Sequence, residues 1–274
     1  GTMVASVAAG KQEKSDTSPM HGVAFEANVL FIAIDDMKPV LGCYGDKLVK
    51  TPNIDKLSES GVTFMHNYCQ QAVCGPSRAS IMTGMRPDHT RVWDLKTRMR
   101  DVNPDILAMP QYFVQNGYET AGIGKVYDPR CVDSDLDKPS WSIPFFRNSN
   151  DYYPESTGKP QGKYQLPETK EKIRKYTAEG KQKGMPKSEL SSFVKQSVMP
   201  SVECADIPDN AYIDGANVEH AKDILAQLAK NDKSFYLAVG ITKPHLPFAA
   251  PKKYWDLYNR EDMPLAEYQE KSVN

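Results

Sequence analysis

The sequence predicts an α/β fold in which a largely parallel central sheet is flanked by helices. Two segments with helical spacing are each followed by an apolar, strand-sized run: 106–116 precedes 118–123, and 217–228 precedes Phe235–Ile241. A third apolar run, Asn28–Ile34, ends abruptly at acidic residues. Because parallel strands need a long crossover connection, usually a helix, this succession favours a parallel sheet.

The first predicted strand, Asn28–Ile34, is rich in Val, Ile and Phe. Such a run is typical of a strand that is buried on both faces. Farther along, the turn at Thr51-Pro52-Asn53 leads into Ile54, Leu57 and Val62, whose spacing predicts an amphipathic helix.

The two later helices have recognisable apolar faces. Ile106, Met109 and Phe113 recur at helical spacing, and Gly117 is placed to end that helix. The face of the second helix consists of Val218, Ala221, Ile224, Leu225 and Leu228. Each helix can therefore pack one side against a sheet.

The composition excludes several classes of protein. The 274 residues include 34 Lys or Arg and 35 Asp or Glu, which gives a formal charge of −1. This balance excludes a generic polyanion-binding basic domain, so we expect no nucleic-acid partner. The longest apolar runs are strand-sized, well below the roughly 18 residues that a membrane-spanning helix needs, and no membrane span is expected.

The chain divides into a leader and a folded part. We expect residues 1–27 to lie outside the fold, as an expression scar at Gly1-Thr2-Met3 and a disordered leader, because the stretch 11–19 is polar and has no periodicity. The folded part is predicted to run over residues 28–274, with a basic surface insertion at about 148–200.

The insertion has two open interpretations. Residues 159–195 carry ten Lys or Arg against four Glu. They form either a basic rim that attracts an anionic substrate or a solvated lysine-rich loop with a helix around 170–176.

The five cysteines show no CxxC pair and no spacing typical of a zinc site. Cys74 stands apart because of its neighbours. The other four are interpreted as packing or disulfide residues: Cys43, Cys69, Cys131 and Cys204.

Asp35 and Asp36 come directly after the first predicted strand. In open α/β sheets, ligands bind at the carboxyl ends of the strands. Where a strand breaks into a turn, adjacent carboxylates can converge on one hard cation. The alternative is a pair of ordinary turn or helix-cap acids.

Cys74 precedes a Pro-Ser-Arg sequence and a helix-compatible run. This pattern predicts that Cys74 lies at a helix N-terminus, where backbone N–H groups and the helix dipole favour an anion. Arg78, one turn later, has a guanidinium group suited to a tetrahedral oxyanion. From these residues alone, the hypothesis is a cysteine nucleophile activated by the helix N-terminus.

The segment Cys74-Gly75-Pro76-Ser77-Arg78, with the following Met82-Thr83-Gly84, resembles the signature of the formylglycine-dependent sulfatases, a branch of the alkaline phosphatase superfamily. Further motifs occur in that family's order: residues 28–36, Thr51-Pro52-Asn53-Ile54-Asp55, Gly122-Ile123-Gly124-Lys125 and Lys243-Pro244-His245-Leu246-Pro247-Phe248. Leu41-Gly42-Cys43-Tyr44-Gly45-Asp46 and Gln70-Gln71-Ala72-Val73-Cys74 are most similar to its iduronate-2-sulfatase group. The resemblance implies an alkaline phosphatase-like sandwich, of which this chain is the N-terminal portion and therefore incomplete.

The resemblance also implies a mechanism. A formylglycine-generating enzyme would oxidise Cys74 to formylglycine, whose hydrate attacks the sulfur of a sulfate ester and later releases sulfate. A calcium ion would be bound by Asp35, Asp36 and the modified position 74, and Arg78 would hold the modified side chain.

Two more residues acquire roles only through the resemblance. Lys125 would contact a sulfate oxygen, and His245 would protonate the leaving alcohol. Lys243 is a weaker substrate-binding candidate, with a structural role as its alternative.

The sequence departs from the family pattern in two places. Asp128 stands close to where sulfatases usually have a His that acts as a base; it either takes over that role or indicates slower turnover or a different substrate. The remaining metal ligands and a second catalytic Lys are expected farther downstream, so we expect a downstream C-terminal chain or fragment as a partner and no activity from the 274 residues alone.

The implied substrate is a sulfated, glycosaminoglycan-like saccharide. A 2-O-sulfated uronate is one candidate, and algal sulfated polysaccharides are rivals. Alternatives are a phosphodiester or phosphonate monoester hydrolase of the same superfamily, an inactive sugar-binding fragment and, last, a plain cysteine hydrolase. Because such glycans are extracellular, we expect a periplasmic, secreted or lysosome-like location.

Overall fold

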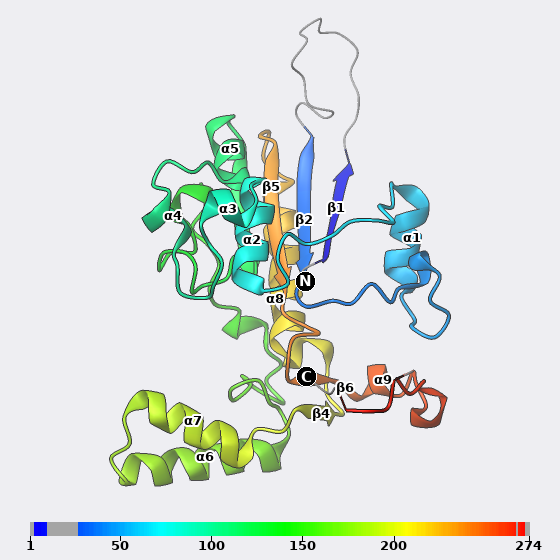
Figure 1. Cartoon of the computed structure of the whole chain (residues 1–274), viewed down its shortest axis with the longest axis vertical. Coiled ribbons are helices and arrows are strands. Elements are labelled where there is room, and N and C mark those ends of the chain that lie inside the picture. Colours follow the sequence, from blue (N-terminus) through cyan, green and yellow to red (C-terminus); the bar gives the residue numbers. More distant parts are fainter. Residues whose placement is uncertain (1–2, 10–26, 267, 272–274) are drawn as a thin grey trace, which may run out of the picture.

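The central sheet brings together strands that are far apart in the sequence (Figure 1). The computed structural model describes residues 3–9, 27–266 and 268–271. Within these residues, four strands form one sheet in the order β1 (Met3–Ala9), β2 (Asn28–Ile34), β5 (Phe235–Ile241) and β3 (Glu119–Gly124). β2, β5 and β3 are parallel, whereas β1 is antiparallel to β2. The predicted α/β fold with a largely parallel sheet is confirmed.

The other elements surround this sheet. The helices are α1 (Pro52–Ser60), α2 (Cys74–Thr83), α3 (Pro87–Thr90), α4 (Met99–Val102), α5 (Met109–Gln115), α6 (Pro167–Gln182), α7 (Lys187–Val198), α8 (Ile213–Leu228) and α9 (Lys252–Trp255). Two further strands, β4 (Val202–Ala205) and β6 (Phe248–Pro251), pair in parallel as a small second sheet.

Helices cover both faces of the central sheet. On one face, Met82 of α2 and Phe113 of α5 pack in a cluster with Tyr236 of β5. On the other face, Ile224 and Leu228 of α8 pack against β3 and β5. Burial of these apolar side chains is what holds the three layers together.

β2 is less buried than its sequence predicts. Phe31 and Ala33 are buried, but Leu30 and Ile32 on the opposite face are only half-buried. In β5, by contrast, Phe235 to Val239 are all buried. The prediction of burial on both faces is therefore wrong for β2, because the described helices cover the centre of the sheet better than its β2 side.

Residues 3–9 differ from the sequence expectation. They form β1, whose register runs from Met3 opposite Ile34 to Ala9 opposite Asn28. The open edge of β2 presents backbone N–H and C=O groups, and an extended segment can pair with them. Residues 3–9 thus belong to the sheet, while the polar stretch 11–19 lies outside the described residues.

Two predicted helices have different bounds in the structure. α1 ends at Ser60, so Val62 lies beyond it and is 82% exposed. α5 begins at Met109 instead of residue 106, with Pro110 in its first turn, the position where the proline ring fits a helix best.

Much of the segment predicted as a basic insertion, residues 167–198, forms a helical hairpin. α6 and α7 lie side by side at one end of the molecule (Figure 1). Tyr164, Ile173 and Val194 are buried in a small cluster that belongs to this hairpin. The predicted helix at 170–176 lies within α6. α7 is not among the predicted helices, although four apolar residues stand at helical spacing along it: Leu190, Phe193, Val194 and Val198.

The cysteines form no disulfide in the structure, where all five are free thiols. Cys131 is buried and serves packing, whereas Cys69 and Cys204 are exposed. None of the helices in the described part of the chain has the length and apolar character that a membrane crossing requires.

Candidate active site

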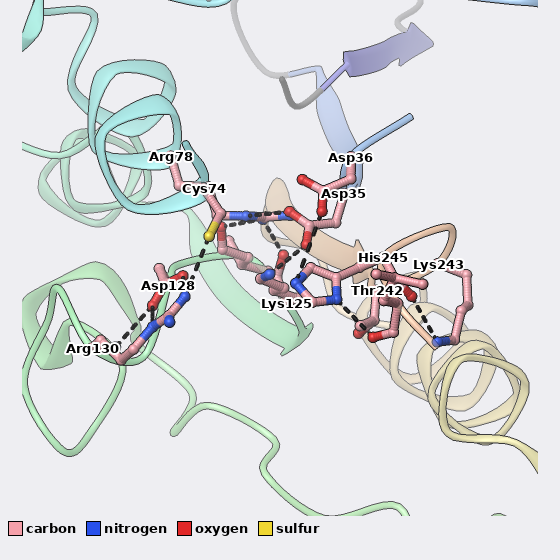
Figure 2. A network of polar contacts seen from close by, with 12 residues as sticks. Asp35, Asp36, Cys74, Arg78, Lys125, Asp128, Arg130, Thr242, Lys243 and His245 are labelled. Carbon is pink, nitrogen blue, oxygen red and sulfur yellow. Dashed lines mark hydrogen bonds and ion pairs between the residues drawn. The ribbon is translucent and has the colours of Figure 1, made fainter. Parts of the chain in front are cut away.

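The candidate site lies where the three parallel strands end. Asp35 follows β2, Lys125 follows β3 and Thr242 follows β5, and Cys74 opens α2 beside them (Figure 2). The carboxyl ends of parallel strands meet at one edge of the sheet, so residues far apart in sequence become neighbours. Figure 2 shows their side chains converging from these elements.

Two glycines bring the strand ends close together. A Cβ atom on Gly240 would lie 2.0 Å from the carbonyl carbon of Lys125, and one on Gly124 would lie 2.1 Å from the carbonyl oxygen of Gly240. Gly124 also has φ +76°, which L side chains rarely adopt. The Lys125 N–H donates to the Gly240 carbonyl at 2.9 Å. Only glycine at both positions allows the strand ends to approach so closely. This approach fixes the position of the Lys125 backbone and so the origin of its side chain.

Asp35 is the centre of a buried charge network. It is fully buried, and its Oδ1 accepts from Arg78 Nη2 at 2.9 Å while its Oδ2 pairs with Lys125 Nζ. Arg78 Nη1 also donates to the carbonyl groups of Lys125 and Val126. Burial alone would raise the pKa of Asp35, but Lys125 and Arg78 hold it below its ordinary value. Asp35 is therefore ionised and held in place from two sides.

Asp36 turns the chain so that the two carboxylates converge. Its backbone has φ +51°, a left-handed conformation that Asp tolerates better than most residues. Asp35, Asp36 and His245 each offer one ligand atom, and these atoms all lie within 4.8 Å of one another. Two carboxylates are hard oxygen donors that suit calcium, and the imidazole suits several other divalent ions. The carboxylates converge as the sequence predicts, but the third member of the group is His245 and not Cys74.

His245 is oriented by its own loop. Its Nδ1 lies 2.8 Å from the carbonyl oxygen of Leu246, and its Nε2 lies 3.8 Å from Asp36 Oδ2. A carbonyl oxygen only accepts, so Nδ1 carries the proton and Nε2 is the reactive nitrogen in neutral His245. This orientation agrees with a role in proton transfer or metal binding at Nε2.

The side chain of Lys243 stabilises the loop that carries His245. Its Nζ donates to the carbonyl groups of His245, at 2.8 Å, and Pro247. Its backbone N–H donates to the Asp214 carboxylate at 2.7 Å. Partial burial and the positive charge of Lys163 lower the pKa of Lys243 to about 8. The structural alternative considered for Lys243 thus fits these contacts better than substrate binding.

Cys74 stands at the first position of α2, as the sequence predicts. Burial and the neighbouring Asp128 carboxylate raise the pKa of its thiol, although Lys125 and Arg130 act in the opposite direction. A cysteine nucleophile needs a lowered pKa to form the thiolate near neutral pH. The hypothesis of a plain cysteine hydrolase therefore loses its physical basis, despite the helix N-terminus.

Asp128 lies next to Cys74 but is poorly suited to act as a base. It is buried, and Arg130 binds it through Nε at 2.9 Å and Nη2 at 2.8 Å. Burial opposes ionisation, but the hydrogen bonds from Arg130 and Cys74 hold its pKa well below its usual range. A carboxylate with so low a pKa takes up protons weakly. The expectation that Asp128 replaces the missing His as the base is thus not supported by its surroundings.

Arg130 is a site residue that sequence reasoning missed. Its Nη2 lies 3.3 Å from Cys74 Sγ, and its side chain remains half-exposed. The available signal was the Asp128-x-Arg130 spacing, which allows an Asx-type turn in which the Arg130 N–H donates to Asp128 at 3.1 Å. Arg130 thus places a guanidinium group beside position 74.

An apolar hollow of about 520 Å³ adjoins the site. Asp36 and His245 are among its polar lining residues, and Leu246, Phe248 and Met37 are among its apolar ones. Such a combination of an apolar wall and a few convergent polar groups is typical of small-ligand sites.

With this geometry in place, comparison with known proteins identifies the family. The family model described as Sulfatase matches residues 27–274, a range that contains every site residue named above. The chain belongs to the sulfatase family. The resemblance drawn from the ordered motifs is confirmed.

Curated relatives agree with the match. The iduronate 2-sulfatases of Mus musculus and Homo sapiens are each 37% identical to this sulfatase chain over 241 residues, which is 87% of the chain and 39% of each relative. A protein described as a sulfatase from Formosa agariphila is 30% identical over 258 residues, 90% of the chain and 45% of that relative. The chain thus spans less than half the length of these relatives.

Solved structures share the fold. The structure of Ps i-CgsB in complex with k-i-k-neocarrahexaose aligns with a TM-score of 0.55 at 21% identity and covers 85% of this sulfatase chain and 49% of that chain. At this identity the structural similarity supports the fold alone. That fold is the alkaline phosphatase-like arrangement of a sheet between helical layers.

Proposed function

We propose that the protein containing this chain hydrolyses sulfate esters of sulfated sugars and uses the side chain at position 74 as its nucleophile. The observation that carries the proposal is the meeting of Cys74, Lys125 and Asp35 at one sheet edge, in a chain of the sulfatase family. Lys125 and Arg130 are the cationic groups near position 74, and they would bind the oxygens of a sulfate placed there.

The nucleophile is proposed to be formylglycine, which provides a hydroxyl of its hydrate in place of the thiol. The raised pKa of Cys74 supports this, because the unmodified side chain is a weak nucleophile. The helix N-terminus and Arg78 remain useful, since they favour negative charge at this position.

Asp35 and Asp36 would hold a calcium ion, which supplies positive charge to the sulfate oxygens. The fit rests on their convergence with His245. We propose that further ligands come from the part of the protein that lies downstream of this chain, since the chain covers only 39% of the length of its iduronate 2-sulfatase relatives. The 274 residues alone are therefore expected to be inactive.

His245 and Asp128 receive different tasks. In its protonated, imidazolium form His245 would donate the proton at Nε2 to the leaving alcohol, while the Nδ1–H stays hydrogen-bonded to the Leu246 carbonyl. Asp128 is a positioning residue in this proposal: its ion pair with Arg130 holds that guanidinium 3.3 Å from the sulfur at position 74.

The proposed substrate is a glycosaminoglycan-like saccharide, with 2-O-sulfated uronate as the leading candidate. The identity of 37% to iduronate 2-sulfatases supports this choice, and the apolar hollow beside His245 offers room for a sugar ring. Hydrolysis of such glycans fits a protein exported to the periplasm, a lysosome-like compartment or the medium.

A phosphodiester or phosphonate ester is the second candidate. The cationic side chains of the site would neutralise a phosphate oxyanion as well as a sulfate oxyanion: Arg78, Lys125 and Arg130. A multifunctional alkaline phosphatase superfamily protein of Trinickia caryophylli is 27% identical over 259 residues. The discriminating measurement is kcat/KM on 4-nitrophenyl sulfate and on a matched phosphodiester.

The test uses the protein purified from its native host, with any downstream segment it carries. Mass spectrometry of the peptide around position 74 is expected to show formylglycine, and the protein is expected to cleave the sulfate in preference to the phosphodiester. A Cys74→Ala variant is the control for nucleophilic catalysis. An unmodified thiol together with binding of sulfated oligosaccharide and no turnover would contradict the proposal and favour the sugar-binding fragment.

A further inference from the structure

Lys163 of the basic insertion reaches the loop that carries His245. Its Nζ donates to the carbonyl oxygen of Leu246 at 3.1 Å. The same oxygen accepts from His245 Nδ1 at 2.8 Å. The ammonium group of Lys163 and the imidazole of His245 therefore share one acceptor, although 82 positions separate the two residues in the sequence.

The tip that presents Lys163 is firmly anchored. Gln161 and Tyr164 exchange two backbone hydrogen bonds of 3.1 Å across a tight turn, in which Gly162 has φ +64°. Tyr164 is buried in the cluster of the α6–α7 hairpin, and its hydroxyl donates to the Pro200 carbonyl at 2.6 Å. Gln165 is also buried, and its N–H donates to Glu203 at 2.6 Å. Lys163 thus projects from a rigid base.

The charge of Lys163 is near other site charges and lacks a carboxylate partner. Partial burial and the positive charge of Lys125 lower the pKa of Lys163. Lys125 is paired with Asp35, whereas Lys163 forms no ion pair with any residue that the structure describes. An ammonium group has three N–H donors, and the Leu246 carbonyl takes one of them. Two donors and a full charge remain for another group.

We propose that Lys163 is a specificity residue that binds a second anionic group of the substrate, in addition to the sulfate that is hydrolysed. This inference rests on the proposed function, whose sulfate lies near Lys125 and position 74. The second group has the chemistry of an oxyanion and is either the carboxylate of a uronate or another sulfate on the saccharide. A charged lysine so close to His245 attracts such a group and strengthens its binding in a partly desolvated site.

This assignment decides between the two interpretations of the insertion. Lys172 of α6 is exposed and belongs to a solvated face. Lys163 is also at the surface, but its ammonium group contacts the loop that carries His245. Lys163, in the segment just before α6, is the part of the insertion that acts as a basic rim for an anionic substrate. The α6–α7 hairpin then works as the support that holds this rim against the His245 loop.

The test compares variants of the mature protein from its native host on three substrates. These are 4-nitrophenyl sulfate, which has no second anion, a 2-O-sulfated uronate disaccharide, and a disulfated disaccharide without a carboxylate. Lys163→Met keeps most of the side chain's length and removes its charge, Lys163→Arg keeps the charge, and Lys172→Met is the matched control on the same insertion. Far-ultraviolet circular dichroism and the melting temperature verify that each variant is folded.

For Lys163→Met we expect KM to rise about tenfold or more on a substrate with a second anion, as loss of a charge-assisted hydrogen bond implies, while 4-nitrophenyl sulfate is cleaved at the wild-type rate. Lys163→Arg should recover most of the affinity, and Lys172→Met should change nothing. If KM rises for the 2-O-sulfated uronate disaccharide, the second group is the carboxylate. If it rises for the disulfated disaccharide, the second group is a sulfate.

Two outcomes would overturn the inference. An equal loss on all three substrates would mean that Lys163 only supports His245 through the Leu246 carbonyl. Unchanged KM on both disaccharides would mean that the lysine faces solvent without a substrate role. If the wild-type protein cleaves none of the three sulfate esters, it is the proposed function that fails; binding of the disaccharides, measured by calorimetry, would still report on Lys163.

Discussion

At the scale of single residues, the site is dominated by charges that are buried with their partners. Asp35 has Arg78 and Lys125, and Asp128 has Arg130. Burying a charge without a partner costs several kcal/mol, roughly 3–5 in measured cases, so the fully buried Asp35 tolerates no loss of Arg78 or Lys125. Arg130 is half-exposed, so the loss of its partner is less costly for it. The carboxylates at both positions are ionised in the folded protein because cations and N–H donors favour that form.

This ionisation makes stability depend on pH in a defined direction. The pKa of Asp128 is lower in the folded protein than the value of about 3.9 expected for an unfolded chain. Its contribution to the free energy of unfolding is therefore complete above about pH 5 and is lost as the pH falls toward the folded pKa. We expect Asp128→Asn to have a lower free energy of unfolding than the wild type at pH 7. This difference in free energy should be smaller at about pH 3.

Urea denaturation at pH 7, 5 and 3 measures this gap. Asp135→Asn is a suitable control, because the carboxylate of Asp135 is exposed and forms only a surface ion pair with Arg147. If the free energies of unfolding of Asp128→Asn and the wild type differ by the same amount at all three pH values, stability is not linked to the ionisation of Asp128.

At the scale of elements, the site depends on how closely the ends of β3 and β5 approach each other. Gly124 and Gly240 face each other in the register of the two strands. The chain leaves β3 at Lys125, so any separation of the strand ends displaces the residue that pairs with Asp35. Packing between elements thus sets catalytic geometry directly.

Gly240→Ala tests this dependence. The added methyl group would meet the backbone of Lys125, so we expect a loss of stability of about 1–3 kcal/mol, as for other overpacked positions. We also expect kcat to fall by about tenfold or more, because small displacements of a positioned group are costly. Gly61→Ala, after the end of α1, is the control with an ordinary backbone conformation. Full activity of Gly240→Ala on 4-nitrophenyl sulfate would show that the strand ends can separate without harm.

At the scale of the whole molecule, the described residues form apolar clusters of different sizes. The large core lies on both faces of the central sheet, whereas the α6–α7 hairpin has its own small cluster around Ile173 and Val194. Small clusters open at lower free energy than a central sheet does. The hairpin is linked to the site through Tyr164 and the turn that bears Lys163.

Ile173→Ala is therefore expected to act locally. Truncation of a buried Ile side chain to Ala costs about 2–5 kcal/mol of stability. Because the hairpin has only a small apolar cluster, we expect this loss to unfold it locally. Amide hydrogen exchange should then accelerate in α6 and α7 while β5 stays protected. Leu237→Ala in β5 is the matched control and should accelerate exchange throughout the sheet. Equal acceleration in both regions by Ile173→Ala would mean that the hairpin and the sheet unfold as one unit.

Much of this molecule could be predicted from the sequence. The apolar runs of β2 and β5, the helical spacing of α8 and the strand after Gly117 are local patterns, because burial requires periodic apolar residues. The convergence of Asp35 and Asp36 and the place of Cys74 at the start of α2 followed from strand ends and helix starts, which are also local features.

The rest was decided by contacts between distant segments. The pairing of residues 3–9 with β2 depends on an open sheet edge, and the hairpin partner α7 depends on a neighbour that covers its short apolar stripe. No local pattern shows that Lys125 and Arg78, 90 and 43 positions away, bind Asp35 and hold its pKa below the ordinary value. Local patterns sufficed to place particular residue types at the strand ends and at the helix start, because periodicity and chain-breaking residues act over a few positions. The charge states and partners of these residues, and the contact of Lys163 with the Leu246 carbonyl, follow from the folded arrangement, because electrostatic and packing energies depend on distance in space and not along the chain.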